Sequence, residues 1–279
     1  MFHFKNKEMP LPTNRFQLLG DVLRYRLFEV ILLSVYMFLF LLPSLIWLIF
    51  SGYLFSNVEN HTIYEVILTN GVNIIFLMIF GLGCSGAFYF LKKVCFQEGE
   101  SINADFFLGI KKNWKMFLFI YFLIGLTYFL LEIGVAYLNY EPNIDSILKG
   151  VLEGIMYAGF ILFMMVFFFM QTQTILYNAT VGQLFRNALK FTFGSFLKNL
   201  GIFAILLLPF FLFEFVPSIN GMDIFQYASI GLEAVFYFGF SYLVFSLYSN
   251  HVFDMTINKN YPENIRKGLA SNDKNLSND

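Results

Sequence analysis

Residues 28–53 read FEVILLSVYMFLFLLPSLIWLIFSGY, and this stretch decides the class of the fold. It carries a single charged side chain, Glu29, and it exceeds the roughly 20 apolar residues that a helix needs to cross about 30 Å of bilayer hydrocarbon. Five further apolar stretches follow it, at 71–90, 116–137, 150–177, 200–215 and 225–248. All are rich in Phe, Leu and Ile without the alternation of barrel strands, so we predict an all-α integral membrane bundle of six transmembrane helices.

The composition agrees with a protein whose main partner is the lipid bilayer. Of 279 residues, 58% are apolar, 20% are aromatic and 13% are charged. A soluble domain has about twice this charged fraction. The net charge of −1 provides no basic field for phosphates, so we expect no nucleic-acid partner. Cys84 and Cys95 are too few for a disulfide framework and lie in or beside apolar runs.

The basic residues are distributed so unevenly that they predict the orientation of the chain. The loops near 56–70, 138–149 and 216–224 contain only Lys149, and the other 17 of the 18 Lys and Arg residues lie in the segments on the opposite side. By the positive-inside rule, both termini are therefore cytoplasmic. This divides the chain into a leader (1–27), a six-helix transmembrane domain (28–258) and a partly disordered polar tail (259–279).

Two cytoplasmic connections have the spacing of amphipathic helices. In residues 103–117 one face carries apolar side chains, with the lysines off it: Phe106, Ile110, Trp114 and Phe117. This pattern predicts a helix that lies in the membrane interface and leads into the third span. Thr180 and Gln183 form a capping-box pair that opens a second such helix. The predicted fold thus includes two cytoplasmic interfacial helices.

Four glutamates are the most distinctive charges within the predicted spans. Each falls in the outer half of its helix, at a similar depth: Glu132, Glu153, Glu214 and Glu233. A charge at mid-membrane costs on the order of 3 kcal/mol, and less toward the interface. With only Lys149 nearby, four carboxylates at one level would attract a cation, a proton or a proton-coupled solute. The alternative is that each lies near its helix end and faces water.

Two further groups of residues belong to helix contacts or to a polar lining. Polar side chains at the inner end of the fourth span either line an inner vestibule or hydrogen-bond to neighbouring helices: Gln171, Gln173 and Asn178. Small residues recur every four positions in the second and fourth spans: Gly83, Ala87, Gly150, Gly154 and Ala158. Such ridges let helix backbones approach closely, so we assign these small residues to helix packing.

Signatures of catalysis are weak. Residues 83–86, Gly-Cys-Ser-Gly, are similar to a rhomboid protease motif, but none of the three histidines is placed to activate Ser85. His251 and Asp254 lack the spacing of an acyltransferase motif, and the sequence contains no P-loop, dinucleotide fingerprint or metalloprotease motif. We therefore expect no enzymatic activity, no cofactor and no metal.

Several short motifs are similar to those of one family. They are Pro43, the run 83–89 before a basic pair, residues 105–115 (DFFLGIKKNWK), Asn187-Ala188, and the closing segments 253–258, 261–262 and 266–269. On these motifs the chain resembles the YesL-like family of bacterial multi-pass membrane proteins, and it departs from that family in its long polar 56–70 segment. The resemblance implies a bacterial plasma-membrane protein of no established activity. Such proteins are often encoded near carbohydrate-uptake systems.

Two hypotheses of function follow. The leading one is a non-enzymatic accessory or scaffolding component that binds membrane subunits of a sugar importer, either singly or as a homo-oligomer. The alternative is a small transporter or channel that uses the outer acidic cluster.

Overall fold

The computed structural model describes residues 11–55, 63–98, 101–141, 144–215, 231–260 and 265–270. These residues form eight α-helices and no strand, which confirms the all-α prediction for this part of the chain. The helices are α1 (Arg15–Tyr25), α2 (Leu27–Phe55), α3 (Ile63–Cys95), α4 (Ile102–Tyr140), α5 (Ser146–Leu176), α6 (Val181–Gly194), α7 (Phe196–Phe215) and α9 (Phe238–Met255). A π-helical turn, η1 (Glu233–Tyr237), precedes α9, and a 3-10 turn, η2 (Ile257–Asn260), follows it.

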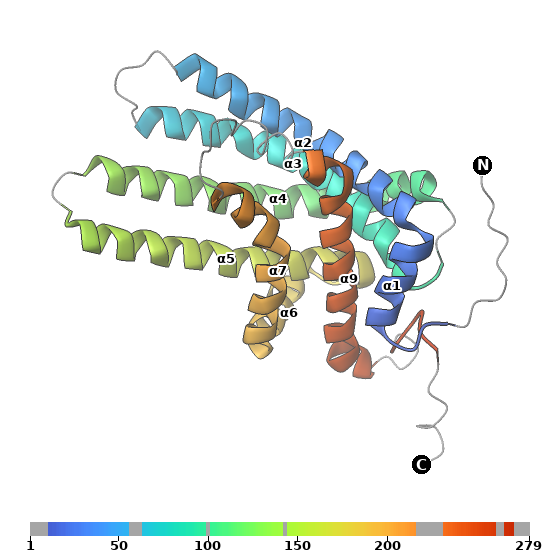
Figure 1. Cartoon of the computed structure of the whole chain (residues 1–279). Helices are drawn as coiled ribbons and strands as arrows, with labels where there is room; N and C mark the ends of the chain where they lie inside the picture. Colours follow the sequence, from blue (N-terminus) through green and yellow to red (C-terminus); the bar gives the residue numbers. More distant parts are fainter. Residues whose placement is uncertain are drawn as a thin grey trace.

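Four long helices, α2 to α5, form two antiparallel pairs that build the body of the bundle (Figure 1). Each is long and apolar enough to cross a membrane, as predicted for the first four spans. The central contact joins α3 to α4, where a side chain on Gly86 would collide with Phe106 and one on Gly109 would collide with Tyr89. These glycines therefore set the short distance between the two helix axes.

The second half of the chain departs from the predicted fifth and sixth spans. The α6 helix and residues 196–205 of α7 meet at a bend of 91°, so together they make one broken span or a re-entrant segment. Residues 225–230 of the predicted sixth span lie outside the described residues, and α9 crosses the bundle (Figure 1). The described residues thus contain four candidate spans, or five when the bent pair counts as one.

The two ends of the bundle differ in character. The far ends of the two helix pairs lie on one side, and α1, the α3–α4 connection and the C-terminal residues 265–270 gather on the other (Figure 1). Two ion pairs lie here: Arg15 of α1 with Asp254 of α9 at 3.0 Å, and Lys93 of α3 with Asp105 of α4 at 2.6 Å. We call this side the basic end, because it holds Arg15, Lys93 and Lys267.

Aromatic rings fill the core between α3, α4, α5 and α9. Phe168 and Phe169 of α5 both contact the ring of Phe245 in α9, with centroids 5.0 and 5.4 Å apart. Phe106 and Phe117 of α4 are fully buried beside them in the same cluster. Such ring pairs add about 0.5–1.5 kcal/mol each beyond the area that they bury.

The predicted helix over 103–117 is not a separate interfacial helix. It is the first part of the continuous α4; Phe106 and Phe117 of its apolar face are buried, whereas Trp114 is 43% exposed. The second predicted helix, opened by Thr180, is present as the separate helix α6. Thr180 and Gln183 form both bonds of the capping box. The leader also contains a helix that was not predicted, α1, whose first turn is capped by the Asn14 side chain.

Candidate functional site

The acidic cluster predicted from the sequence is only partly described by the structure. Glu132 and Glu153 are half-buried and lie on facing helices, α4 and α5. Gly134 meets Met156 across this pair. In this register Glu132 and Glu153 are about one to two helical turns apart. The side chains of the other two lie outside the described part: Glu214 and Glu233.

The predicted inner lining does not form one surface. Gln171 is buried in the core, and Asn178 is exposed after the end of α5. Gln173 is also buried, and its amide donates to the Phe169 carbonyl at 3.1 Å and to the Leu184 carbonyl at 3.4 Å. Gln173 therefore ties α5 to α6, which is the interhelical hydrogen bonding that was the alternative to a vestibule.

The two stripes of small residues have different surroundings. A side chain on Gly83 would lie 2.8 Å from the Cβ of Phe40 in α2, and Ala87 is fully buried. On α5, by contrast, Gly150 and Gly154 have open space around them. Ala158, the third residue of that stripe, is exposed. The α5 stripe thus packs against no helix in the described part of the chain, because α5 turns its other faces to α4 and α6.

Four polar groups from four helices meet in the apolar core, and we call them the tyrosine cluster. The Tyr121 hydroxyl lies 2.9 Å from the Cys84 thiol, 3.1 Å from the Tyr242 hydroxyl and 3.2 Å from the Gln171 carbonyl oxygen. Cys84 and Tyr242 are themselves 3.4 Å apart. All four side chains are buried. Hydrogen bonds in such a dry core fix α3, α4, α5 and α9 relative to one another.

Local spacing gives no sign of the tyrosine cluster. Cys84 and Gln171 were singled out for other reasons, and nothing near Tyr121 or Tyr242 distinguishes them from other tyrosines of the spans. Only the packing of α9 onto the long helices brings the four together. Ser85, next to Cys84, is buried and donates to the Gly109 carbonyl at 3.0 Å. Its hydroxyl is thus engaged in the α3–α4 contact.

The strongest charged contact lies at the basic end. Arg15 is 9% exposed, and its guanidinium binds the Asp254 carboxylate at 3.0 Å and the Lys267 carbonyl at 3.0 Å. Asp254 also accepts from the Asn258 amide at 2.9 Å and from the Arg266 backbone N–H at 3.2 Å. These charge-assisted bonds join α1, α9 and residues 265–270.

Further contacts extend this joint into an ordered layer that we call the platform, formed by α1, residues 96–98 after α3, the first turns of α4 and residues 265–270. Lys267 pairs with Glu98 at 2.9 Å. Gly268 has φ +83°, and a side chain there would collide with the carbonyl of Cys95 at the end of α3. Only glycine allows the chain to pass this close in a left-handed conformation.

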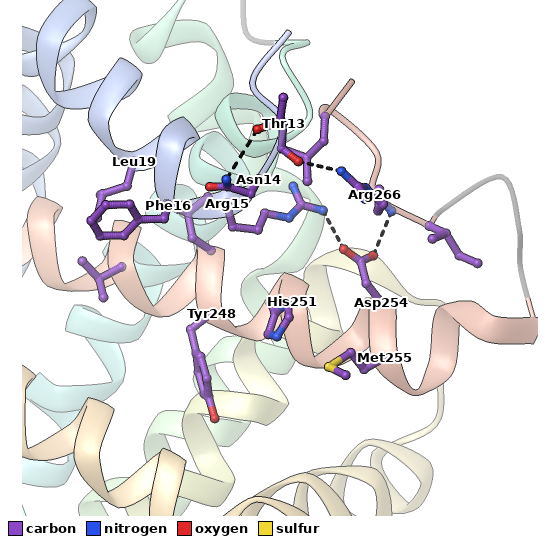
Figure 2. A pocket seen from close by; sticks show the side chains of 14 residues that line it. Thr13, Asn14, Arg15, Phe16, Leu19, Tyr248, His251, Asp254, Met255 and Arg266 are labelled. Carbon is purple, nitrogen blue, oxygen red and sulfur yellow. Dashed lines mark hydrogen bonds and ion pairs between the residues drawn. The ribbon is translucent and has the colours of Figure 1, made fainter. Parts of the chain in front are cut away.

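A cleft of about 770 Å³ opens in the platform between α1 and α9, and we call it the α1–α9 cleft (Figure 2). One end of its lining is apolar, with Phe16 and Leu19 of α1. Arg15, Asp254 and Arg266 line the other end. Its size and its few polar groups on an apolar wall are those of a ligand site, which typically measures about 300–1,000 Å³.

His251 and Asp254, which lack the spacing of a catalytic motif, both lie in this cleft. Asp254 forms an ion pair with Arg15 at 3.0 Å. Among the described residues, no group of three or more His, Cys, Asp and Glu side chains is arranged to hold a metal. The cleft is lined by apolar side chains, by the guanidinium groups of Arg15 and Arg266, and by other polar side chains, among them Asn14, Tyr248 and His251.

Comparison of the chain with family models, with curated proteins and with solved structures gives no match.

Proposed function

We propose that this multi-pass helical membrane protein is a non-enzymatic accessory or scaffolding component that binds other membrane proteins through its platform. We further propose that it has six spans, with the platform and both termini in the cytoplasm. The positive-inside rule supports this orientation, since α1 and residues 265–270 of the platform carry Arg15, Arg24, Arg266 and Lys267.

The observation that carries the proposal is the order of the platform. Arg15 and Asp254 are almost buried, and an ion pair of this kind is costly to leave half-made. Because such contacts hold the platform segments in place, the platform presents a fixed surface. Aromatic side chains stand exposed on two helices that the basic segments form: Phe107 is 58% exposed in the first turns of α4, and Phe193 is 60% exposed on α6. Exposed aromatic residues on a rigid support are typical anchors of protein interfaces.

The finer part of the proposal concerns the partner. The resemblance to the YesL-like family supports the membrane subunits of a sugar importer in a bacterial plasma membrane. This part rests on the motifs alone, whereas the scaffolding role rests on the platform.

The test is a pull-down of the tagged full chain from its native membrane in a mild detergent, followed by mass spectrometry. We expect stoichiometric recovery of membrane subunits of a transporter, and loss of this recovery in the double variant Phe107→Arg, Phe193→Arg. Tyr64→Arg is the matched control, because Tyr64 is 80% exposed at the opposite end of the bundle. Recovery of the chain alone, or equal recovery with all variants, would contradict the proposal.

One observation favours the alternative, a small transporter for a cation or a proton-coupled solute. Glu132 and Glu153 lie within one to two turns of each other across the α4–α5 contact. The double variant Glu132→Gln, Glu153→Gln would then abolish flux in proteoliposomes without unfolding the protein. Flux that is unchanged, or that the wild-type chain does not show under any gradient, would exclude this function.

A further inference from the structure

The α1–α9 cleft is amphiphilic along its length. Leu19 of α1 lies at one end, and the guanidinium groups of Arg15 and Arg266 lie at the other (Figure 2). Val244 of α9 also lines the cleft, ten residues before Asp254 in the chain. The order of residues along α9 follows the same change, from Val244 through Tyr248 to Asp254. A ligand that matches this wall has an apolar chain at one end and a polar group at the other.

The charge of the polar end favours an anion. Two arginines face one carboxylate there, and Asp254 already accepts three hydrogen bonds. The Arg266 guanidinium donates to the Thr13 carbonyl at 2.6 Å and pairs with no carboxylate in the described part of the chain, so its charge is not compensated there. A phosphate, which carries several acceptor oxygens, would compensate this charge.

The position of the cleft selects a lipid over a soluble anion. The α1 helix leads directly into α2, a candidate membrane span, and Phe16 beside the cleft is 84% exposed. A phenylalanine that exposed on a short helix next to a span is suited to the acyl-chain region at the bilayer surface. Basic clusters beside a span also attract anionic headgroups.

We propose that the α1–α9 cleft binds one anionic glycerophospholipid, with its phosphate at Arg15 and Arg266 and an acyl chain along Leu19 and Val244. Arg15 is held in place by Asp254 and the Lys267 carbonyl, so the phosphate meets a preorganised guanidinium. The bound lipid would join α1, α9 and residues 265–270, and it would therefore strengthen the platform. This inference does not depend on the proposed scaffolding function.

The test uses the delipidated full chain in detergent, titrated with dioleoylphosphatidylglycerol or dioleoylphosphatidylcholine and followed by native mass spectrometry. We expect the phosphatidylglycerol to bind more tightly, and Arg266→Gln to weaken its binding by about fivefold, as expected for one basic group at a lipid surface. Arg24→Gln is the matched control, since Arg24 is an exposed arginine of α1 that does not line the cleft.

A second pair of variants tests the apolar end. Val244→Trp should block the cleft and weaken binding of both lipids, whereas Val151→Trp, on the 53% exposed Val151 of α5, should leave binding unchanged. Thermal unfolding of each variant without lipid separates lost binding from lost folding.

Three outcomes would overturn the proposal. The first is equal binding of the two lipids with no effect of Arg266→Gln. The second is binding of inorganic phosphate alone as tight as that of phosphatidylglycerol, which would make the cleft a site for a soluble anion. The third is lipid binding only after removal of residues 1–10, which would make the chain's own amino-terminal residues the occupant.

Discussion

Asp254 shows how much depends on one carboxylate at the basic end. Asp254→Asn keeps the shape of the side chain but leaves the Arg15 guanidinium, 9% exposed, without its counter-charge. Breaking one partner of a buried ion pair typically costs about 3–5 kcal/mol, so we expect a loss of this order in the free energy of unfolding. Denaturant titration of the chain in mixed micelles measures it.

The control for this prediction is Glu98→Gln. Glu98 and Lys267 are 46% and 40% exposed, and a pair in water contributes about 0–1 kcal/mol. If Asp254→Asn and Glu98→Gln lowered the free energy of unfolding equally, burial would not explain the contribution of the Arg15–Asp254 pair to stability.

The tyrosine cluster gives a second prediction for a single residue. Tyr121→Phe removes the hydroxyl that contacts Cys84, Gln171 and Tyr242, and it leaves the buried Gln171 carbonyl without this donor. We expect a loss of about 1–3 kcal/mol in the free energy of unfolding, the usual cost of an unsatisfied buried group. Tyr64→Phe, at an 80% exposed tyrosine, should change the unfolding midpoint little. Similar midpoints for both variants would show that the cluster contributes no stability.

Among the helices, the α3–α4 contact is the one most sensitive to volume. A side chain on Gly109 would lie 3.0 Å from the Ser85 carbonyl and 3.1 Å from the Gly86 Cα, and backbone atoms cannot move aside cheaply. Gly109→Ala should therefore cost about 1–3 kcal/mol, as overpacking does. Gly154→Ala meets open space and should be neutral or slightly stabilising, because alanine favours a helix. Unfolding of the two variants in parallel tests the pair, and a neutral Gly109→Ala would refute the close approach.

The helices also show what could be predicted from the sequence. The first four spans and the Thr180 capping box depend on local composition and spacing, so they were recognised without tertiary information. The pattern in 103–117 predicted a helix correctly but not its continuity with the third span, and an apolar face has the same spacing whether protein or lipid covers it. The α1 helix was missed within a leader interpreted only by its charge, although Asn14 is a good N-cap residue and Leu18 and Val22 have helical spacing.

The binding surfaces were beyond the sequence for a different reason. The residues of the tyrosine cluster and of the α1–α9 cleft are far apart in the chain: Arg15 contacts Asp254, and Cys84 contacts Tyr242. No local pattern encodes such contacts, which arise only when α9 packs across the long helices. The four glutamates, by contrast, were selected because they lie at a similar predicted depth in the membrane. Depth does not determine whether their side chains lie on helix faces that contact one another.

For the whole molecule, the central prediction is the orientation and the number of spans. Cys84 and Cys95 are fully buried, so they should not react with a maleimide in the native protein. Single cysteines can therefore be introduced on this background. A membrane-impermeant maleimide should label Asp145→Cys, in the exposed α4–α5 turn, in intact cells, and should label Arg24→Cys, on α1, only after permeabilisation. Labelling in the reverse order would contradict the positive-inside assignment.

The same labelling distinguishes five spans from six or four. Asp223→Cys lies in the segment between the fifth and sixth predicted spans, so six spans require that it be labelled from outside, like Asp145→Cys. If α6 and α7 form a re-entrant segment, the chain returns to the cytoplasm and Asp223→Cys is labelled only after permeabilisation. An external Asp223→Cys, together with a Lys274→Cys labelled only after permeabilisation, requires the chain after residue 223 to cross the membrane once more. A tail labelled from outside would instead leave five spans, and it would separate residues 271–279 from the platform on which the proposed scaffold depends.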